Sequence, residues 1–333
     1  MSTFQIVIVG TGFIGASHAN AIKEMPGVKL AGIVEKDEER GKAAANKNGC
    51  AWYPSFEEMT LNKTPDLAII ALPTFLHEEY VIKAANAKIN VLCEKPVTLS
   101  LESFDRMTKA CEENNVRFMV AQVVRWWPEY VETRKLIKSN TIGSIRVISL
   151  ARLAQHPNWS TWHTDPQKSG GALFDLHIHD IDYLYSLFGM PKNVYAIGWK
   201  SQYGCWNHVV SNLCWKDGTK AVVEASMDMK GGFPFTNELR VAGEMGTIDY
   251  RFTAGVNIKD GNQSSGMLVC QEGGNACQKE VVQYDPFRAE VSAYISAIAE
   301  KRQAPIPTEQ SRCVLQVVQA IEQSLETNQC IKL

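Results

Sequence analysis

The sequence predicts an α/β fold with two domains, a doubly wound parallel sheet over residues 1–122 and a second α/β domain over residues 123–333. The chain has 333 residues, more than one hydrophobic core usually serves. In its first third, short β-branched runs alternate with helical patterns, which is typical of a parallel sheet covered on both faces. After Gln122 the pattern changes to strands separated by glycine-rich turns, which indicates a mostly antiparallel sheet.

The first domain is expected to contain five strands with a helix after each of the first four. The predicted strands cover residues 6–9, 28–34, 66–72, 89–93 and 116–120, and the predicted helices cover 13–24, 37–48, 77–87 and 100–114. Pro26-Gly27 ends the first helix and Gly49 ends the second, because proline and glycine interrupt helical backbone.

The second domain is expected to mix strands with four longer helices. A strand is predicted at 145–154, and helices at 129–139, 172–188, 287–300 and 308–327. The turn signals Asp217-Gly218 and Gly243-Glu244-Met245-Gly246 separate further strands. The aromatic segment 156–171 is expected to be a loop over a cleft, and the polar, glycine-rich residues 257–279 to be long loops between strands.

The composition excludes several classes of function. The formal net charge is -2 and the sequence pI is about 6.4, so a basic footprint for nucleic acid or anionic lipid is missing. The nine cysteines are odd in number and form no CxxC pair, which favours a reducing compartment. We find no signal peptide and no apolar run of about 18 residues. A cytoplasmic protein acting on a small polar molecule is expected, with neither nucleic acid nor membrane as partner.

The first motif predicts a phosphate-binding turn. Gly10-Thr11-Gly12-Phe13-Ile14-Gly15 matches GxGxxG directly after an apolar strand and at the start of a helix. Gly10 permits the tight turn, Gly12 lets the backbone approach a pyrophosphate, and Gly15 lets the helix pack on the strand. The helix N-terminus then offers free N–H groups and a favourable dipole. The alternative is a plain glycine-rich turn without a ligand.

The end of the second strand bears on the choice of cofactor. Glu35 lies about 20 residues past the glycines, where an acidic side chain accepts hydrogen bonds from a ribose 2′-hydroxyl. A carboxylate repels a 2′-phosphate, so Glu35 favours NAD over NADP. The neighbouring Lys36 keeps NADP possible, since a cation can accept that phosphate.

Lys95 is the first candidate catalytic residue. Glu94-Lys95-Pro96 follows a predicted parallel strand, and ligands of open α/β sheets bind beyond those strand ends. A cation beside an oxidised nicotinamide ring would have its pKa lowered toward the working range. A solvated lysine at a strand end is the alternative interpretation.

A glycine pair and a helix carry the second candidate group. Gly170-Gly171 precedes a predicted helix in which Asp175 and His179 are four residues apart and therefore share a face. A histidine oriented by a carboxylate is a credible general base near neutral pH. A structural Asp–His bond is one alternative. A metal site is another, using the side chains of His177, His179, Asp180 and Asp182. However, positions two apart on a helix diverge, so no metal is expected.

Together these residues resemble the glucose–fructose oxidoreductase / inositol dehydrogenase (Gfo/Idh/MocA) family over essentially the whole chain. The resemblance rests on GxGxxG, Ala71-Leu72-Pro73-Thr74 with His77, Glu94-Lys95-Pro96, Arg125-Trp126-Trp127-Pro128, the glycine pair before Asp175-x3-His179, and Phe287…Glu290. It implies a Rossmann domain followed by an open, mainly antiparallel sheet whose outer face forms a homodimer or homotetramer.

The resemblance also implies roles for individual residues. Lys95, Asp175 and His179 would form the catalytic group. The cofactor would be held by Gly10, Gly12, Phe13, Ile14, Gly15, Glu35, Lys36, Leu72, Pro73, His77, Glu94, Lys95 and Gln122. The substrate would meet Lys95, Arg125, Trp162, Asp165, Asp175 and His179, with Trp159 in the same loop. For the two tryptophans, packing against the second domain's sheet is an equal alternative.

The expected reaction transfers a hydride between the nicotinamide and a secondary hydroxyl of a sugar, inositol or sugar derivative. His179 would take the hydroxyl proton while Lys95 stabilises the developing negative charge on the same oxygen. Two other functions remain open. One is an NAD-dependent glycosidase or lyase that oxidises its sugar transiently. The other is a cofactor-sensing regulator without catalysis.

Overall fold

The structure is a computed structural model that describes residues 3–156, 162–255 and 263–333. The chain forms two compact units. The first comprises Met1–Trp126 and Asp285–Arg312, and the second comprises Trp127–Tyr284 and Cys313–Leu333. The predicted division at 122/123 assigned all later residues to the second domain, whereas here a late segment returns to the first unit. No helix in the described ranges combines the length and apolar character needed to cross a membrane.

The first unit contains the predicted doubly wound parallel sheet, which is confirmed. Its six strands run in the order β3-β2-β1-β4-β5-β6. They are β1 (Phe4–Val9), β2 (Val28–Val34), β3 (Ala51–Tyr53), β4 (Leu67–Ile70), β5 (Asn90–Cys93) and β6 (Phe118–Val120). The strand order reverses at β1 and β4, and ligands of such sheets bind at this switch point beyond the carboxyl ends of the strands.

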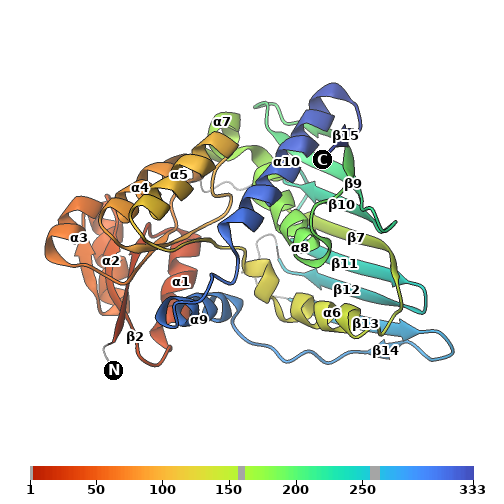
Figure 1. Ribbon diagram of the computed structural model, residues 1–333, viewed down its shortest axis with the longest axis horizontal. Coiled ribbons are helices and arrows are strands. Elements are labelled where there is room, and N and C mark those ends of the chain that lie inside the picture. The colour runs from red at the N-terminus through yellow and green to blue at the C-terminus, as the bar shows by residue number, and fades with distance from the viewer. Residues whose placement is uncertain (1–2, 157–161, 256–262) are drawn as a thin grey trace. The chain divides into compact units, whose positions relative to one another are not determined.

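Helices flank this sheet (Figure 1). They are α1 (Phe13–Lys23), α2 (Glu38–Asn48), α3 (Phe56–Asn62), α4 (His77–Asn86), α5 (Leu101–Glu113) and α9 (Pro286–Ala299), with 3-10 turns η1 (Thr74–Leu76) and η2 (Val123–Trp126). Side-chain caps start four of them, α2, α3, α5 and α9, because Asp37, Ser55, Ser100 and Asp285 each accept a first-turn N–H. The sequence did not predict β3 or α3. Three residues are too few to show a strand period.

Helix α9 explains why a late segment belongs to the first unit. Its Val291 and Tyr294 are fully buried in the same core as the β1 and β4 strands. The Tyr294 hydroxyl donates to the Val91 carbonyl at 3.0 Å, and the Glu290 carboxylate accepts from the Gln122 N–H at 2.7 Å. A helix with such partners is part of this core, although it follows the second domain's strands in sequence.

The second unit contains a nine-stranded sheet in the order β14-β13-β12-β11-β7-β10-β9-β8-β15. The strands are β7 (Ile145–Leu153), β8 (Asn193–Lys200), β9 (Trp206–Cys214), β10 (Lys220–Ser226), β11 (Thr236–Gly243), β12 (Gly246–Thr253), β13 (Ser264–Gln271), β14 (Cys277–Gln278) and β15 (Ile331–Lys332). β7 and β10 pair in parallel and the other pairs are antiparallel, so the mostly antiparallel sheet is confirmed.

The second unit's helices are α6 (Pro128–Lys138), η3 (Trp162–Thr164), α7 (Pro166–Ser169), the π-helical turn η4 (Leu173–His177), α8 (Ile178–Phe188) and most of α10 (Thr308–Thr327). Figure 1 shows α6, α8 and α10 beside this sheet. The predicted helix at 172–188 is present, with the π-helical turn η4 at its start. One prediction was wrong here, because the polar stretch 257–279 contains β13 and β14 rather than loops alone. β13 lacks the apolar alternation that identifies a strand, since Ser264, Ser265 and Gly266 begin it.

A buried ion pair ties helix α8 to the sheet. Arg152 on β7 donates to the two Asp180 carboxylate oxygens at 2.8 and 3.1 Å, and both side chains are almost completely buried. The Tyr130 hydroxyl of α6 lies 3.3 Å from the Arg152 guanidinium and donates to the Asn237 side-chain oxygen at 2.8 Å. Asp180 is the residue after His179 on α8. The network therefore holds the part of the helix on which His179 lies.

Candidate functional site

The glycine loop of the first unit has the geometry that its motif predicts. Gly10 has a φ of +100°, and a Cβ built there would lie 2.5 Å from the Ala71 carbonyl oxygen. A Cβ at Gly15 would lie 2.2 Å from the Gly10 carbonyl oxygen. At Gly12 the same test finds nothing within 4 Å. Gly12 is also the N-cap of α1 and contributes no side-chain cap. The helix N-terminus therefore faces open space, which suits a pyrophosphate.

Glu35, at the carboxyl end of β2, is a nearly buried carboxylate with several donors around it. It accepts from the Thr11 hydroxyl at 2.6 Å, the Asp37 N–H at 3.1 Å and the Arg40 guanidinium at 2.9 Å. Burial raises the pKa of Glu35, but these hydrogen bonds outweigh it and the net pKa is lowered. The side chain is thus ionised at neutral pH. Arg40 was not predicted, because its contact depends on where α2 begins.

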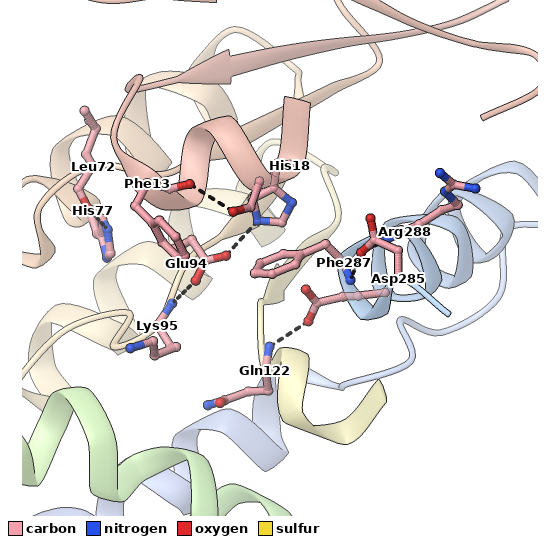
Figure 2. Close-up of polar contacts among 12 residues, drawn as sticks. Phe13, His18, Leu72, His77, Glu94, Lys95, Gln122, Asp285, Phe287 and Arg288 are labelled. Carbon is pink, nitrogen blue, oxygen red and sulfur yellow. Dashed lines mark hydrogen bonds and ion pairs between the residues drawn. The ribbon is translucent and has the colours of Figure 1, made fainter. Parts of the chain in front are cut away.

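Residues from the ends of β5 and β6 meet near the start of α1. Figure 2 shows Glu94, Lys95 and Gln122 in this region together with Phe13 and His18. The Glu94 carboxylate accepts from His18 at 2.7 Å and from the Lys95 N–H at 3.2 Å. His18 is fully buried and was missed by the sequence reasoning. A histidine in the middle of an apolar helix gives no spacing signal.

His77 is buried, and both of its ring nitrogens lie beside backbone carbonyls. Its Nε2 lies 2.8 Å from the Leu72 carbonyl oxygen, and its Nδ1 lies 3.0 and 3.2 Å from the carbonyl oxygens of Pro96 and Val97. Burial lowers the pKa of His77, although these carbonyls and the Glu94 charge oppose that effect. His77 therefore joins the turn after β4 to the turn after β5 and positions the loop that contains Lys95 (Figure 2).

Several buried polar side-chain atoms in this unit lack a hydrogen-bond partner among the described residues, and one of them lies just after β6. The Gln122 side-chain oxygen is inaccessible to solvent and accepts no hydrogen bond there. Such an atom costs free energy unless a ligand supplies a donor. With the open N-terminus at Gly12 and the carboxylate of Glu35, it makes this edge of the sheet fit a nicotinamide dinucleotide.

In the second unit, the predicted Asp175 and His179 lie on a distorted helix. Asp175 is in the π-helical turn η4, and His179 is in the first turn of α8. Turns of this kind bond residues five apart, are rare and are frequent at functional sites. The prediction of a shared face assumed regular α-helix throughout, and the π turn changes that spacing.

The neighbouring titratable residues have structural partners. His177 is fully buried with its Nε2 2.8 Å from the Ser211 hydroxyl, and burial lowers its pKa to about 3. Asp180 pairs with Arg152. Two of the four side chains considered as metal ligands are thus engaged elsewhere. The described ranges contain no cluster of three or more His, Cys, Asp or Glu side chains suited to a metal.

The predicted substrate residues lie in different places. Arg125, in the first unit, is largely buried and donates to the Gln310 side chain at 2.8 Å. In the second unit, Trp162 stacks on His163 with ring centroids 3.9 Å apart. Asp165 caps α7, accepting from the Gln167 N–H at 3.0 Å, and pairs with Lys168. Trp159 lies outside the described residues.

Two family models match consecutive parts of the chain. The model described as an oxidoreductase family with an NAD-binding Rossmann fold matches residues 4–122. The model described as the GFO/IDH/MocA C-terminal domain matches residues 130–249. Together they cover most of the sequence and correspond to both parts of the predicted fold.

Curated relatives include enzymes of two kinds. A 2,7-anhydro-N-acetylneuraminate hydratase of Mediterraneibacter gnavus is 35% identical over 60% of this chain and 53% of its own length. A D-xylose 1-dehydrogenase (NADP(+)) of Haloferax volcanii is 26% identical over 98% of both chains. The chain thus spans about half the length of the first relative and nearly all of the second.

Solved structures share the fold at low identity. The aldose-aldose oxidoreductase of Caulobacter crescentus, complexed with glycerol, superposes with a TM-score of 0.87 at 20% identity, over 99% of this chain and 100% of that one. A levoglucosan dehydrogenase in complex with NADH and levoglucosan gives 0.83 at 22% identity, over 99% of both chains.

Proposed function

Because the chain belongs to the Gfo/Idh/MocA oxidoreductase family, we propose that it transfers a hydride between a nicotinamide cofactor and a secondary hydroxyl of a sugar, inositol or sugar derivative. The supporting observation is the carboxyl end of the parallel sheet in the first unit, where a Cβ at Gly12 would meet nothing within 4 Å and the buried Gln122 oxygen has no hydrogen-bond partner among the described residues. The relatives and structural neighbours include a D-xylose dehydrogenase and a levoglucosan dehydrogenase, which supports the substrate class.

The proposed proton chemistry uses three side chains. The nicotinamide supplies the hydride acceptor or donor when it is bound. His179 removes the proton from the substrate hydroxyl, and Lys95 donates a hydrogen bond to the same oxygen, which stabilises its negative charge. Asp175 orients His179 or holds a neighbouring hydroxyl. In the reverse direction His179 returns the proton to the carbonyl oxygen.

A panel of inositols, aldoses, sugar acids and glycosides tests this proposal. Each is incubated with the protein and NAD⁺ or NADP⁺ while the absorbance of reduced nicotinamide is followed. We expect one substrate group to react, and His179→Asn to lower its turnover by about 10²–10⁴-fold. His208→Asn is the control, since His208 pairs with Glu224 on β10. An H179N variant with full turnover at saturating substrate would sink the assignment of the base.

A second candidate function has a specific observation in its favour. The hydratase relative is 35% identical, higher than the dehydrogenase named above, and adding water to a substrate involves no net redox change. The same residues would then hold the sugar while its hydroxyl is oxidised transiently, with NAD as the hydride acceptor, and the hydride would return to the sugar after elimination or addition. Product formed from a glycoside or anhydro-sugar with catalytic NAD, without accumulation of reduced cofactor, distinguishes this reaction from net oxidation.

A homodimer or homotetramer formed through the nine-stranded sheet also belongs to the proposal. The large apolar side chains of Ile197, Trp199, Val222 and Leu268 are exposed on its strands. Two exposed ion pairs also join β11 to β12, with the positions of the charges exchanged between the strands. In one pair Arg240 of β11 contacts Asp249 of β12, and in the other Glu238 of β11 contacts Arg251 of β12. Mixed charges of this kind suit a second copy of the same surface. Light scattering on Ile197→Glu should show a smaller species than the wild type, and an unchanged mass would exclude this surface.

A further inference from the structure

The carboxylate of Glu35 is already saturated with hydrogen bonds before any cofactor binds. One oxygen accepts from the Thr11 hydroxyl at 2.6 Å and the Thr11 N–H at 3.3 Å. The other accepts from the Asp37 N–H at 3.1 Å and the Arg40 guanidinium at 2.9 Å. An ionised carboxylate has about four lone-pair positions, and four donors occupy them here. A ribose hydroxyl can therefore bind Glu35 only if one donor leaves.

The backbone of Glu35 is held on both sides, which fixes the point from which its side chain extends. Its N–H donates to the Tyr53 carbonyl at 3.1 Å, and its carbonyl accepts from the Trp52 indole N–H at 2.9 Å. The indole reaches this position because residue 41 is glycine. A Cβ there would lie 2.1 Å from the indole nitrogen. The strand β3 thus fixes the end of β2.

Of the four donors, the Arg40 side chain is the easiest to displace. Two of the other donors are the backbone N–H groups of Thr11 and Asp37, which can move only if the turns after β1 and β2 move. The third is the hydroxyl of Thr11, which is a short side chain on the turn after β1. The Arg40 side chain is 63% exposed, although its partner Glu35 is only 8% exposed, so the guanidinium can move into water without any change in the backbone. Its guanidinium has five donors in a planar fork, which also suits a phosphate.

We propose that Arg40 is the specificity-determining residue for the cofactor, and that it lets this chain bind both NAD and NADP. With NAD, Arg40 releases Glu35, which then accepts the ribose 2′-hydroxyl. With NADP, the guanidinium stays between Glu35 and the 2′-phosphate and donates to both. The inference rests on cofactor binding by the first unit, and it gives to Arg40 the role that the sequence suggested for Lys36.

The chain offers a matched set of variants. Arg40→Ala and Lys36→Ala remove the same charge from neighbouring positions, so long-range electrostatic effects on an anionic cofactor are the same. Arg40→Ala keeps the cap of α2, because the Asp37 carboxylate accepts from the backbone N–H of residue 40 at 2.9 Å. Alanine also favours helix. Arg40→Lys keeps the charge and removes the fork.

The experiment titrates the wild type and the three variants with NADH and NADPH, following nicotinamide fluorescence, with circular dichroism as the check of folding. We expect the wild type to bind both cofactors. Arg40→Ala should weaken NADPH binding at least about tenfold, as the loss of a charge-assisted hydrogen bond does. The same variant should leave NADH binding unchanged or tighter, since a competitor for Glu35 has gone. Arg40→Lys should fall between, and Lys36→Ala should change both affinities little.

Three results would overturn the inference and leave the proposed function standing. Arg40→Ala can weaken NADH and NADPH equally, which would make Arg40 a structural support only. Lys36→Ala can cause the selective loss of NADPH, which would assign the phosphate to Lys36. The wild type can bind NADH alone, which would make the chain specific for NAD. A folded wild type that binds neither cofactor would overturn the proposed function together with this inference.

Discussion

Replacing Arg152 with methionine should strongly destabilise the second unit. Arg152 makes two hydrogen bonds to the Asp180 carboxylate, at 2.8 and 3.1 Å, and the exposed fractions of the two side chains are 2% and 0%. Methionine fills much of the same volume but leaves the Asp180 charge buried and uncompensated. Breaking a buried pair in this way costs about 3–5 kcal/mol. For a unit of this size, that corresponds to a fall in Tm of roughly 6–20 °C.

Differential scanning calorimetry measures this effect as the fall in Tm of the variant relative to the wild type. Arg146→Met is the matched control. Arg146 also pairs with a carboxylate, that of Glu244 at 3.6 Å, but the exposed fractions are 68% and 48%, so the loss should stay within about 1 kcal/mol. The double variant Arg152→Met/Asp180→Leu should recover most of the stability, because no buried charge remains. If Arg152→Met lowers the Tm no more than Arg146→Met does, the buried ion pair does not hold α8.

Two further predictions concern the first unit and the thiols. Gly10→Ala should abolish cofactor binding, because its Cβ would meet the Ala71 carbonyl oxygen at 2.5 Å. Gly49→Ala, also at positive φ but with open space around it, should leave cofactor titrations unchanged. Burial raises the pKa of Cys111 to about 12, so a thiol reagent at pH 8 should label the exposed Cys277 and leave Cys111 unmodified until the protein unfolds. Mass spectrometry of the labelled peptides checks this, and equal labelling rates in the folded protein would contradict it.

The first unit was largely predictable because its signals are local. Buried parallel strands are short apolar runs, and each is followed by a helix, so both patterns are visible in one stretch of sequence. The requirement for glycine at residue 10 is also local, since a positive φ belongs to one turn. Short elements such as Ala51–Tyr53 gave no pattern, although β3 later proves to hold the backbone of Glu35.

The parts that were missed depend on contacts between distant residues. Helix α9 joins the first unit through Glu290, which lies 168 residues from its partner Gln122. His18 meets Glu94 across 76 residues, and Arg40 reaches Glu35 only because Asp37 starts α2 where it does. The π-helical turn at Leu173–His177 differs from an α-helix in its hydrogen-bond pattern, and no residue type in the sequence predicts that pattern.

Titration of the purified chain with NADH, followed by energy transfer from tryptophan to the reduced nicotinamide, is the most direct test that the first unit binds the cofactor. We expect saturable binding by the wild type, loss of binding in Gly10→Ala and retention in Gly49→Ala, because only the first change blocks the turn beside α1. A folded wild type that shows no saturable binding of either NADH or NADPH would contradict the cofactor site and the oxidoreductase function built on it.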